Sequence, residues 1–220
     1  IQGNIEAKNL GVENELSTDI LTVNTINNPR YPATLDGDID LYVNSITGND
    51  DYSLDTVLAS IDESETQGSA DLIKKFASLR GVANALPLNL NGKTVRIYLE
   101  TDDYGQVLFK NFNSGRILIF LCSNEVKGYI GDYNCYADFK IYGGSSTSTP
   151  STYGTIRPST NTVYNDGSDK CSVFFQKSPV SGIYYCKVYG GSTSSGYMTI
   201  KVTEDSKCRI DTCDFYSAYA

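Results

Sequence analysis

Apolar and polar residues alternate along much of the second half of the chain, which is the pattern of half-buried β-strands. Residues 95–99, 107–109 and 117–121 each place apolar side chains at every second position. Residues 39–43 follow the same rule and are followed by a turn signal at Gly48-Asn49-Asp50. The pattern predicts an all-β chain of short strands from residue 92 onward, preceded by one isolated strand.

One segment follows a helical spacing instead. Apolar residues recur at intervals of three and four over residues 70–85, and Leu86-Pro87 ends the run, so we expect a helix there. The residues of this apolar face are Leu72, Ile73, Phe76, Leu79, Val82 and Ala83. Residues 50–70 are acidic and rich in Ser and Thr, which favours a surface loop. Residues 145–165 are poor in apolar residues and predict an inserted, protruding loop.

The last third of the chain contains an internal repeat. Residues 171–175 align with residues 198–202 at a shift of 27, which also places Ile183 on Ile210 and Cys186 on Cys213. Residues 140–144 resemble residues 187–191 at a shift of 47, as if one repeat carried an insertion of about twenty residues. A repeat of this length predicts one coil of a β-solenoid, in which like residues stack in columns. A β-sandwich with recurring strands is the alternative.

The N-terminal residues contain a shorter echo. The apolar positions of residues 5–12 recur eleven residues later in residues 16–23. An eleven-residue period is compatible with a right-handed coiled coil, but the Thr, Asn and β-branched residues of the second copy favour strands. A thin ribbon buries its apolar side only against other copies. We therefore expect residues 1–30 to form a β-rich trimeric neck and residues 31–220 to form one domain.

Composition narrows the choice of partners. The chain has 220 residues, is 40% hydrophobic and carries a net charge of −8. An acidic chain repels phosphate, so nucleic acid is not an expected partner, and no apolar run is long enough to insert into a membrane. No basic region precedes an apolar run, so these residues hold no Sec-type signal, and the first residue, Ile1, is compatible with a piece of a longer protein.

The six cysteines predict free thiols rather than a metal or disulfide framework. No CxxC pair and no histidine occur in the chain, so we expect no metal site and no cofactor. The cysteines are Cys122, Cys135, Cys171, Cys186, Cys208 and Cys213. We expect them to be buried and reduced, as in a protein assembled in a reducing bacterial cytoplasm.

Four stretches between residues 40 and 100 form a recognisable series: Leu41-Tyr-Val43, Gly48-Asn-Asp50, the run Phe76-Ala-Ser-Leu-Arg-Gly-Val-Ala-Asn-Ala-Leu-Pro87, and Asn91-Gly-Lys-Thr-Val-Arg-Ile97. This series resembles the beginning of the body of phage tail fibre and tailspike proteins, a family with a right-handed parallel β-helix of pectate-lyase-like fold. The motifs cover residues 40–100, and the coil pattern extends the resemblance to residue 220. Lys75 stands where the family has a proline. The resemblance implies a capping helix before the first coil, a homotrimer, contacts with other tail and baseplate proteins, and a place in the virion.

The sequence leaves two kinds of function to consider, catalysis and binding. The absence of histidine excludes the Ser-His-Asp triad, the Cys-His dyad and the HExxH site. A pair of carboxylates for glycan cleavage remains, and Asp211 and Asp214 are the weak candidates for it. We therefore expect no catalytic residues, with a glycan depolymerase as the alternative.

Binding to a bacterial surface polysaccharide fits the tyrosines, which offer an apolar ring and a polar hydroxyl. The chain has 17 tyrosines, and the candidates for glycan binding are Tyr153, Tyr164, Tyr197 and Tyr216. The expected function is adsorption of a phage to a cell-surface glycan. A structural scaffold of the tail or baseplate is a further alternative.

Overall fold

A computed structural model of the chain describes residues 34–101, 107–122, 125–157, 164–165, 170–190 and 197–216. Within these residues most of the structure is β, arranged in three sheets whose strands are parallel except for one antiparallel pair. The expected all-β class is confirmed at this level. The expected neck of residues 1–30 lies outside the described residues.

The three sheets differ in their number of strands. The six-stranded sheet contains, in spatial order, β1 (Ile39–Val43), β2 (Thr94–Leu99), β4 (Arg116–Leu121), β7 (Asp138–Tyr142), β11 (Ser181–Tyr184) and β14 (Cys208–Asp211). The five-stranded sheet contains β3 (Val107–Lys110), β6 (Ile130–Tyr133), β10 (Lys170–Gln176) and β13 (Tyr197–Thr203), with β9 (Tyr164–Asn165) antiparallel to β10. The four-stranded sheet contains β5 (Glu125–Lys127), β8 (Gly154–Arg157), β12 (Cys186–Tyr189) and β15 (Asp214–Tyr216).

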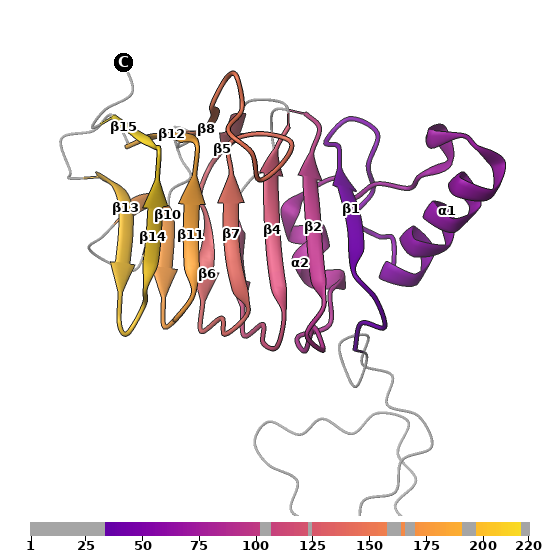
Figure 1. Cartoon of the computed structure of the whole chain (residues 1–220), viewed down its shortest axis with the longest axis horizontal. Coiled ribbons are helices and arrows are strands. Elements are labelled where there is room, and N and C mark those ends of the chain that lie inside the picture. Colours follow the sequence, from indigo (N-terminus) through magenta and orange to yellow (C-terminus); the bar gives the residue numbers. More distant parts are fainter. Residues whose placement is uncertain are drawn as a thin grey trace, which may run out of the picture.

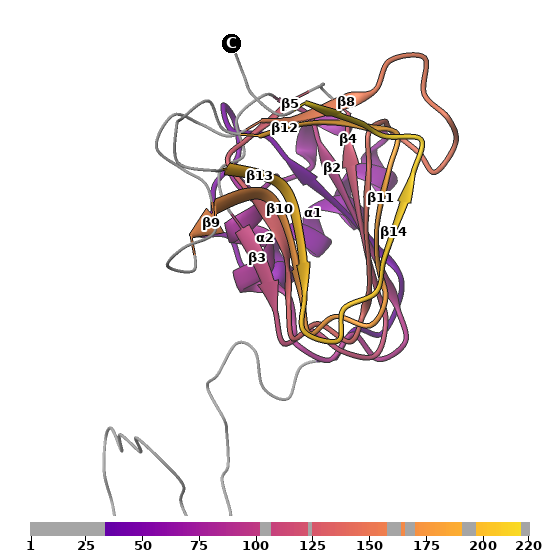
Figure 2. The ribbon, with the colours of Figure 1, turned by 90° about the vertical axis from the view of Figure 1, so that its left-hand side faces the viewer.

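The chain passes through the sheets in a repeating order. From β4 onward it leaves the six-stranded sheet for the four-stranded sheet, then enters the five-stranded sheet, and then returns to a strand beside the one it left, whereas β2 is followed directly by β3 of the five-stranded sheet. We call one such passage a coil. Figure 1 shows the strands of successive coils side by side, and Figure 2, viewed along the stack, shows the three sheets around a common interior. Parallel pairing brings residues at equivalent positions of successive coils together.

Isoleucines form one column of the interior. Ile119 pairs with Ile141, Ile141 with Ile183, and Ile183 with Ile210. The first three side chains are fully buried, whereas Ile210 in the last coil is 47% exposed. The expected shift of 27 is confirmed for residues 171–175 and for Ile183. Columns of this kind bury apolar side chains that no single coil covers alone.

The expected shift of 47 is wrong. Residues 140–142 lie in the six-stranded sheet and pair with residues 182–184, a shift of 42, while residues 187 and 188 lie in the four-stranded sheet beside β8. The similar sequences of residues 140–144 and 187–191 therefore do not mark equivalent positions of two coils, because residues 140–142 and residues 187 and 188 lie in different sheets. The shortest coils repeat every 22 residues, as between β4 and β7, and the coil from β7 to β11 is 20 residues longer. The extra residues lie on both sides of β8, so the expected single insertion is wrong.

The helical region differs from the expected helix over residues 70–85. Residues 54–67, expected as a loop, form α1 (Leu54–Gln67), and a short 3₁₀ turn (Ala70–Leu72) precedes α2 (Leu79–Ala85). Phe76 is extended because its N–H donates to the carbonyl of Tyr42 and its own carbonyl accepts from Asn44. Pairing with β1 thus overrides the helical spacing around Phe76. No helix in the described part of the chain has the length and apolarity needed to cross a membrane.

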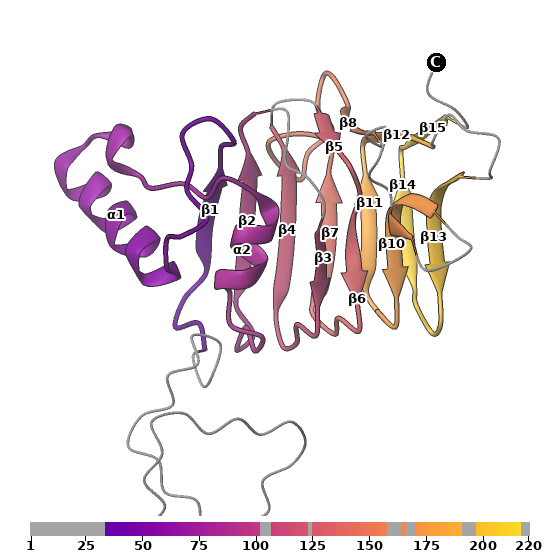
Figure 3. The ribbon, with the colours of Figure 1, turned by 180° about the vertical axis from the view of Figure 1, so that it is seen from behind.

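The two helices occupy different places in the stack. Figure 3 shows α2 in line with β3, β6 and β10, so α2 continues the face of the five-stranded sheet. Figure 1 shows α1 beyond β1, at the end where the described chain begins. Ser53 caps α1 by accepting from the N–H of Thr56, and Gly68 ends the helix in a left-handed conformation. The expected capping helix therefore corresponds to two separate helices.

The expected loop at residues 145–165 is only partly a loop. Residues 145–152 are exposed, but Gly154–Arg157 form β8, and Ile156 is fully buried in the interior. Residues 158–163 lie outside the described residues. One strand of the core is therefore contained in the segment that composition assigned to an insertion.

All six cysteines are free thiols, as expected, but their burial varies. Cys135, Cys171 and Cys186 are buried, Cys208 and Cys213 are half-buried, and Cys122 is exposed. The expectation of burial is therefore wrong for Cys122. Burial raises the pKa of the Cys135 thiol to about 12, which keeps this interior thiol protonated.

Candidate functional site

A ladder of aromatic rings runs along the outer face of the six-stranded sheet. In each strand the ring follows an inward-facing Leu or Ile, so alternation directs the ring outward. Successive rings are stacked with centroids 4.8–5.4 Å apart and planes within about 21° of parallel. The ladder consists of Tyr42, Tyr98, Phe120, Tyr142 and Tyr184. Because ring faces stack on one another, mainly the ring edges and hydroxyls face outward.

The ladder ends at Tyr184, whose partner in the next coil is Asp211. The guanidinium carbon of Arg209 lies 5.8 Å from the centroid of the Tyr184 ring. Gly182 makes room for this ring, because a β-carbon at position 182 would lie 2.7 Å from Cε2 of Tyr184. The last ring of the ladder is thus placed by a glycine on its own strand and an arginine from the next coil.

Two further tyrosines extend the aromatic surface. Tyr185 lies at the corner between β11 and β12 with a φ of 57°, a left-handed conformation that bulky residues rarely adopt. Its ring centroid lies 6.5 Å from that of Tyr184 and 6.2 Å from that of Tyr153, which ends the exposed loop before β8. We call the group Tyr142, Tyr153, Tyr184 and Tyr185, together with Arg209 and Asp211, the tyrosine cluster.

The charged members of the tyrosine cluster are paired with each other. Nη2 of Arg209 donates to Oδ2 of Asp211 at 2.7 Å, and the hydroxyl of Thr212 donates to Oδ1 at 2.9 Å. The Thr212 hydrogen bond and the nearby guanidinium lower the pKa of Asp211. Burial raises the pKa of Tyr142, so its hydroxyl remains protonated and able to donate at neutral pH. The cluster offers aromatic surface beside hydrogen-bond donors and acceptors.

The surroundings of Asp211 do not fit the general acid of a glycosidase pair. Asp211 ends β14 in the six-stranded sheet, and Thr212 and Cys213 separate it from Asp214, which begins β15 in the four-stranded sheet. A general acid needs a raised pKa, whereas the pKa of Asp211 is lowered. Asp211 is therefore better suited to accept hydrogen bonds and to hold Arg209 than to donate a proton.

Of the four tyrosines expected to bind glycan, Tyr153 and Tyr216 are the two whose side chains the structure describes, and they lie in different aromatic groups. Tyr153 belongs to the tyrosine cluster. Tyr216 stacks on Tyr189 with centroids 4.4 Å apart, and the guanidinium of Arg157 lies over Tyr189, so these residues form a separate surface on the four-stranded sheet. Tyr164 in β9 and Tyr197 in β13 pair with opposite edges of β10, and their side chains lie outside the described residues.

Sequence reasoning did not select Tyr142, Tyr184, Tyr185 or Arg209. A signal for the ladder exists in the sequence, because an apolar–aromatic dipeptide recurs in the strands of the six-stranded sheet. The dipeptides are Leu41-Tyr42, Ile97-Tyr98, Ile119-Phe120, Ile141-Tyr142 and Ile183-Tyr184. The role of Arg209 depends on its guanidinium lying over the ring of Tyr184, which no local pattern indicates.

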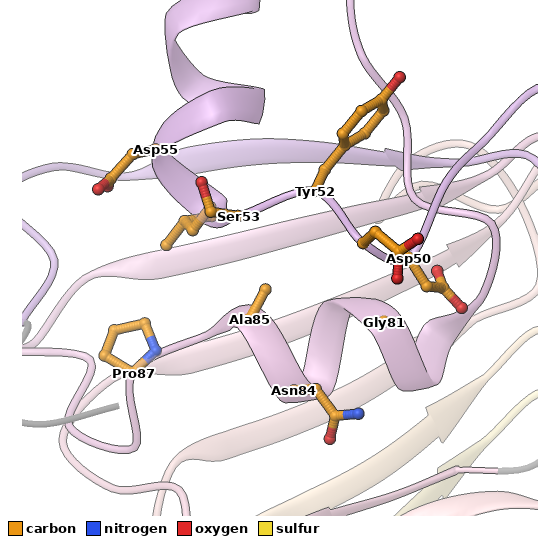
Figure 4. Close-up of a pocket in the computed structure, with 10 residues that line it drawn as sticks. Asp50, Tyr52, Ser53, Asp55, Gly81, Asn84, Ala85 and Pro87 are labelled. Atoms are coloured by element: carbon orange, nitrogen blue, oxygen red, sulfur yellow. The ribbon is translucent and has the colours of Figure 1, made fainter. Parts of the chain in front are cut away.

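A pocket of about 330 Å³ lies between the start of α1 and α2 (Figure 4). Asp50, which lines it, accepts hydrogen bonds from the N–H and the hydroxyl of Ser78 at the start of α2. Its carboxylate comes so close to Gly81 that a β-carbon there would overlap with it. Asp50 therefore holds α2 against the turn after β1, and we assign its carboxylate a structural role.

No set of three or more metal-ligating side chains gathers anywhere in the described ranges. The chain matches no family model, no curated protein and no solved structure in the comparisons with known proteins.

Proposed function

We propose that this chain is the body of a bacteriophage tail appendage that attaches the particle to a bacterial surface glycan. The single observation that carries the proposal is the tyrosine cluster on the outer face of the six-stranded sheet. The half-buried rings of Tyr153, Tyr184 and Tyr185 offer apolar surface to the C–H groups of a sugar. Arg209, Asp211 and the tyrosine hydroxyls offer partners to sugar hydroxyls.

The proposal includes a finer description of the fold. Crossover connections between parallel strands of one sheet are right-handed in nearly all proteins, and this supports our inference of a right-handed parallel β-helix. The motifs of the family resemblance pack against one another, which supports the assignment: a β-carbon at Gly48 would overlap with the carbonyl of Phe76, and Phe76 pairs with Val43. We further propose a homotrimer located in the virion, and sedimentation of the whole chain tests the trimer.

Tyr185 supports a role in binding rather than in folding. A left-handed corner favours Gly or Asn, so a tyrosine there has a conformational cost of about 1 kcal/mol. The neighbouring positions in the same corner column are Gly143 and Thr212. A bulky ring at such a position is explained when the ring contacts a ligand.

Substitution of Tyr185 tests the proposal. Tyr185→Asn removes the ring but keeps a residue that tolerates the left-handed corner, so stability should be retained. We expect the labelled chain to bind to one of a panel of bacterial surface polysaccharides and the variant to bind about fivefold more weakly, as for the loss of about 1 kcal/mol. The matched control is Tyr136→Asn, which removes a ring that is 62% exposed outside the cluster. Equal affinities of the two variants would count against the cluster as the glycan site.

A structural connector within a phage tail is the second candidate function. The last coil favours it, because its interior column residues Val202, Ile210 and Phe215 are between 40 and 47% exposed. The equivalent side chains one coil earlier are fully buried. If the chain bound no polysaccharide of the panel, the connector would become the better account.

A further inference from the structure

A groove of about 730 Å³ separates α1 from the outer face of the first strand of the six-stranded sheet. The figures show α1 standing beyond β1, at the opposite end of the stack from β14. The volume falls in the range that holds several side chains of a ligand. The residues used below are a subset of those that line the groove.

One face of α1 contributes both apolar and acidic side chains to the groove. Leu58, Ile61, Asp62 and Glu65 follow the spacing i, i+3, i+4 and i+7, which places them in one stripe along the helix. Leu58 and Ile61 pack against the core and remain half-buried. Asp62 and Glu65 are exposed. The stripe therefore combines an apolar floor with a negatively charged rim.

The wall of the groove opposite α1 also combines apolar and charged side chains. Tyr42 stacks on Tyr98 on one side and lines the groove, and Ile73 adds a half-buried apolar side chain. Arg96 contributes the basic group of the lining, but it is held by Asp40 at 2.9 Å and Asp38 at 3.2 Å.

Three carboxylates of the lining are left without a cation. Within the described residues, no basic side chain forms an ion pair with Asp36, Asp62 or Glu65. With five carboxylates and one guanidinium, the lining carries a formal charge of −4. A cationic occupant gains attraction here, and its apolar side chains gain contact with Leu58 and Ile61.

We propose that this groove binds a basic, amphipathic segment of a different protein. Its Lys or Arg side chains would pair with Asp62 and Glu65, and its apolar side chains would cover Leu58, Ile61 and Ile73. A second copy of this chain carries a net charge of −8, so charge disfavours it as the occupant of this groove, and the homotrimer proposed above does not depend on the groove. The chain's own residues 1–33 hold four acidic and two basic side chains, so charge disfavours them as well.

Binding of a short labelled peptide of lysine and leucine to the whole chain tests the proposal. We expect Asp62→Asn combined with Glu65→Gln to weaken binding about tenfold, and added salt to weaken it further. A control variant, Glu63→Gln with Asp205→Asn, removes the same charge from exposed positions outside the groove lining and should change affinity less than about twofold.

Three outcomes would overturn the proposal. The two double variants would bind the peptide equally if the attraction came from the overall charge of the chain. A peptide of glutamate and leucine would bind as tightly as the basic peptide if charge complementarity played no part. The groove variant would change the association state of the chain in sedimentation if a second copy occupied the groove. Circular dichroism of both variants controls for loss of α1.

Discussion

Asp132 is a carboxyl group inside the apolar interior. Its neighbours in the same column are Phe109 and Phe175, and its side chain has no exposed surface. The hydroxyl of Ser181 donates to Oδ2 at 2.7 Å, while Oδ1 has no hydrogen-bond partner. Burial raises the pKa of Asp132 to about 7, although hydrogen bonds from Ser178 and Ser181 oppose the shift. The folded state therefore retains a proton that an unfolded chain loses near pH 4.

Stability should consequently fall as the pH rises. Between about pH 4 and pH 7 the folded chain binds the proton and the unfolded chain does not, so the free energy of unfolding decreases with pH and then levels off above pH 7. Asp132→Asn cannot ionise and should remove this dependence, which is on the order of 3 kcal/mol. Urea unfolding at pH 5 and pH 8 measures the difference. An unchanged pH dependence in the variant would show that Asp132 is not the group responsible.

Gly182 positions the last ring of the aromatic ladder. Gly182→Ala would place a β-carbon against the ring of Tyr184, and the ring would have to move because it is the mobile partner. We expect glycan affinity to fall about fivefold while stability is retained, since alanine is tolerated in a strand at least as well as glycine. Gly37→Ala, with open space around its β-carbon, is the control. Equal polysaccharide affinity of the two variants would contradict this role of Gly182.

Among the elements, the strands were the easiest to predict from the sequence. Alternation in residues 95–99 reflects one buried face, and β2 lies there. Residues 117–121 form β4, in which the apolar side chains of both faces are buried. The helices were harder, because Phe76 has a helical spacing but pairs with β1. Three features of the sequence are typical of α1, namely an N-cap residue at Ser53, a C-cap residue at Gly68 and the helical spacing of Leu58 and Ile61. The acidic composition of the segment favours a loop, and it led to the prediction of a loop.

The isoleucine column allows a matched test of the stacked strands. Ile141 has a coil on each side and no exposed surface, whereas Ile210 has a coil on one side only. Ile141→Ala should reduce the free energy of unfolding by about 2–5 kcal/mol through lost burial and a cavity, and Ile210→Ala by less than about 1.5 kcal/mol. Denaturant titration gives both values. Equal losses would indicate that position 210 is covered as completely as position 141.

At the scale of the whole molecule, the internal repeat predicted that successive coils stack on one another. It did not predict which strand of a coil belongs to which of the three sheets. The shift of 27 is visible because residues 171–202 repeat without an insertion. Between β7 and β11 the shift is 42, because extra residues lie on both sides of β8. The sequence repeat is not visible across these residues, so composition assigns β8 to a loop. The tyrosine cluster brings together β7, the loop before β8, β11 and β14, and tertiary proximity of this kind has no local signature.

We propose that glycan attachment, without cleavage, takes place on the outer face of the six-stranded sheet. The most direct measurement incubates the labelled whole chain with bacterial cells and follows retention on the cells and release of reducing sugars together. We expect retention without sugar release for the chain, and retention that falls for Tyr185→Asn but not for Tyr136→Asn. Release of reducing sugars would contradict attachment without cleavage. The absence of retention on every bacterial strain tested would contradict attachment itself.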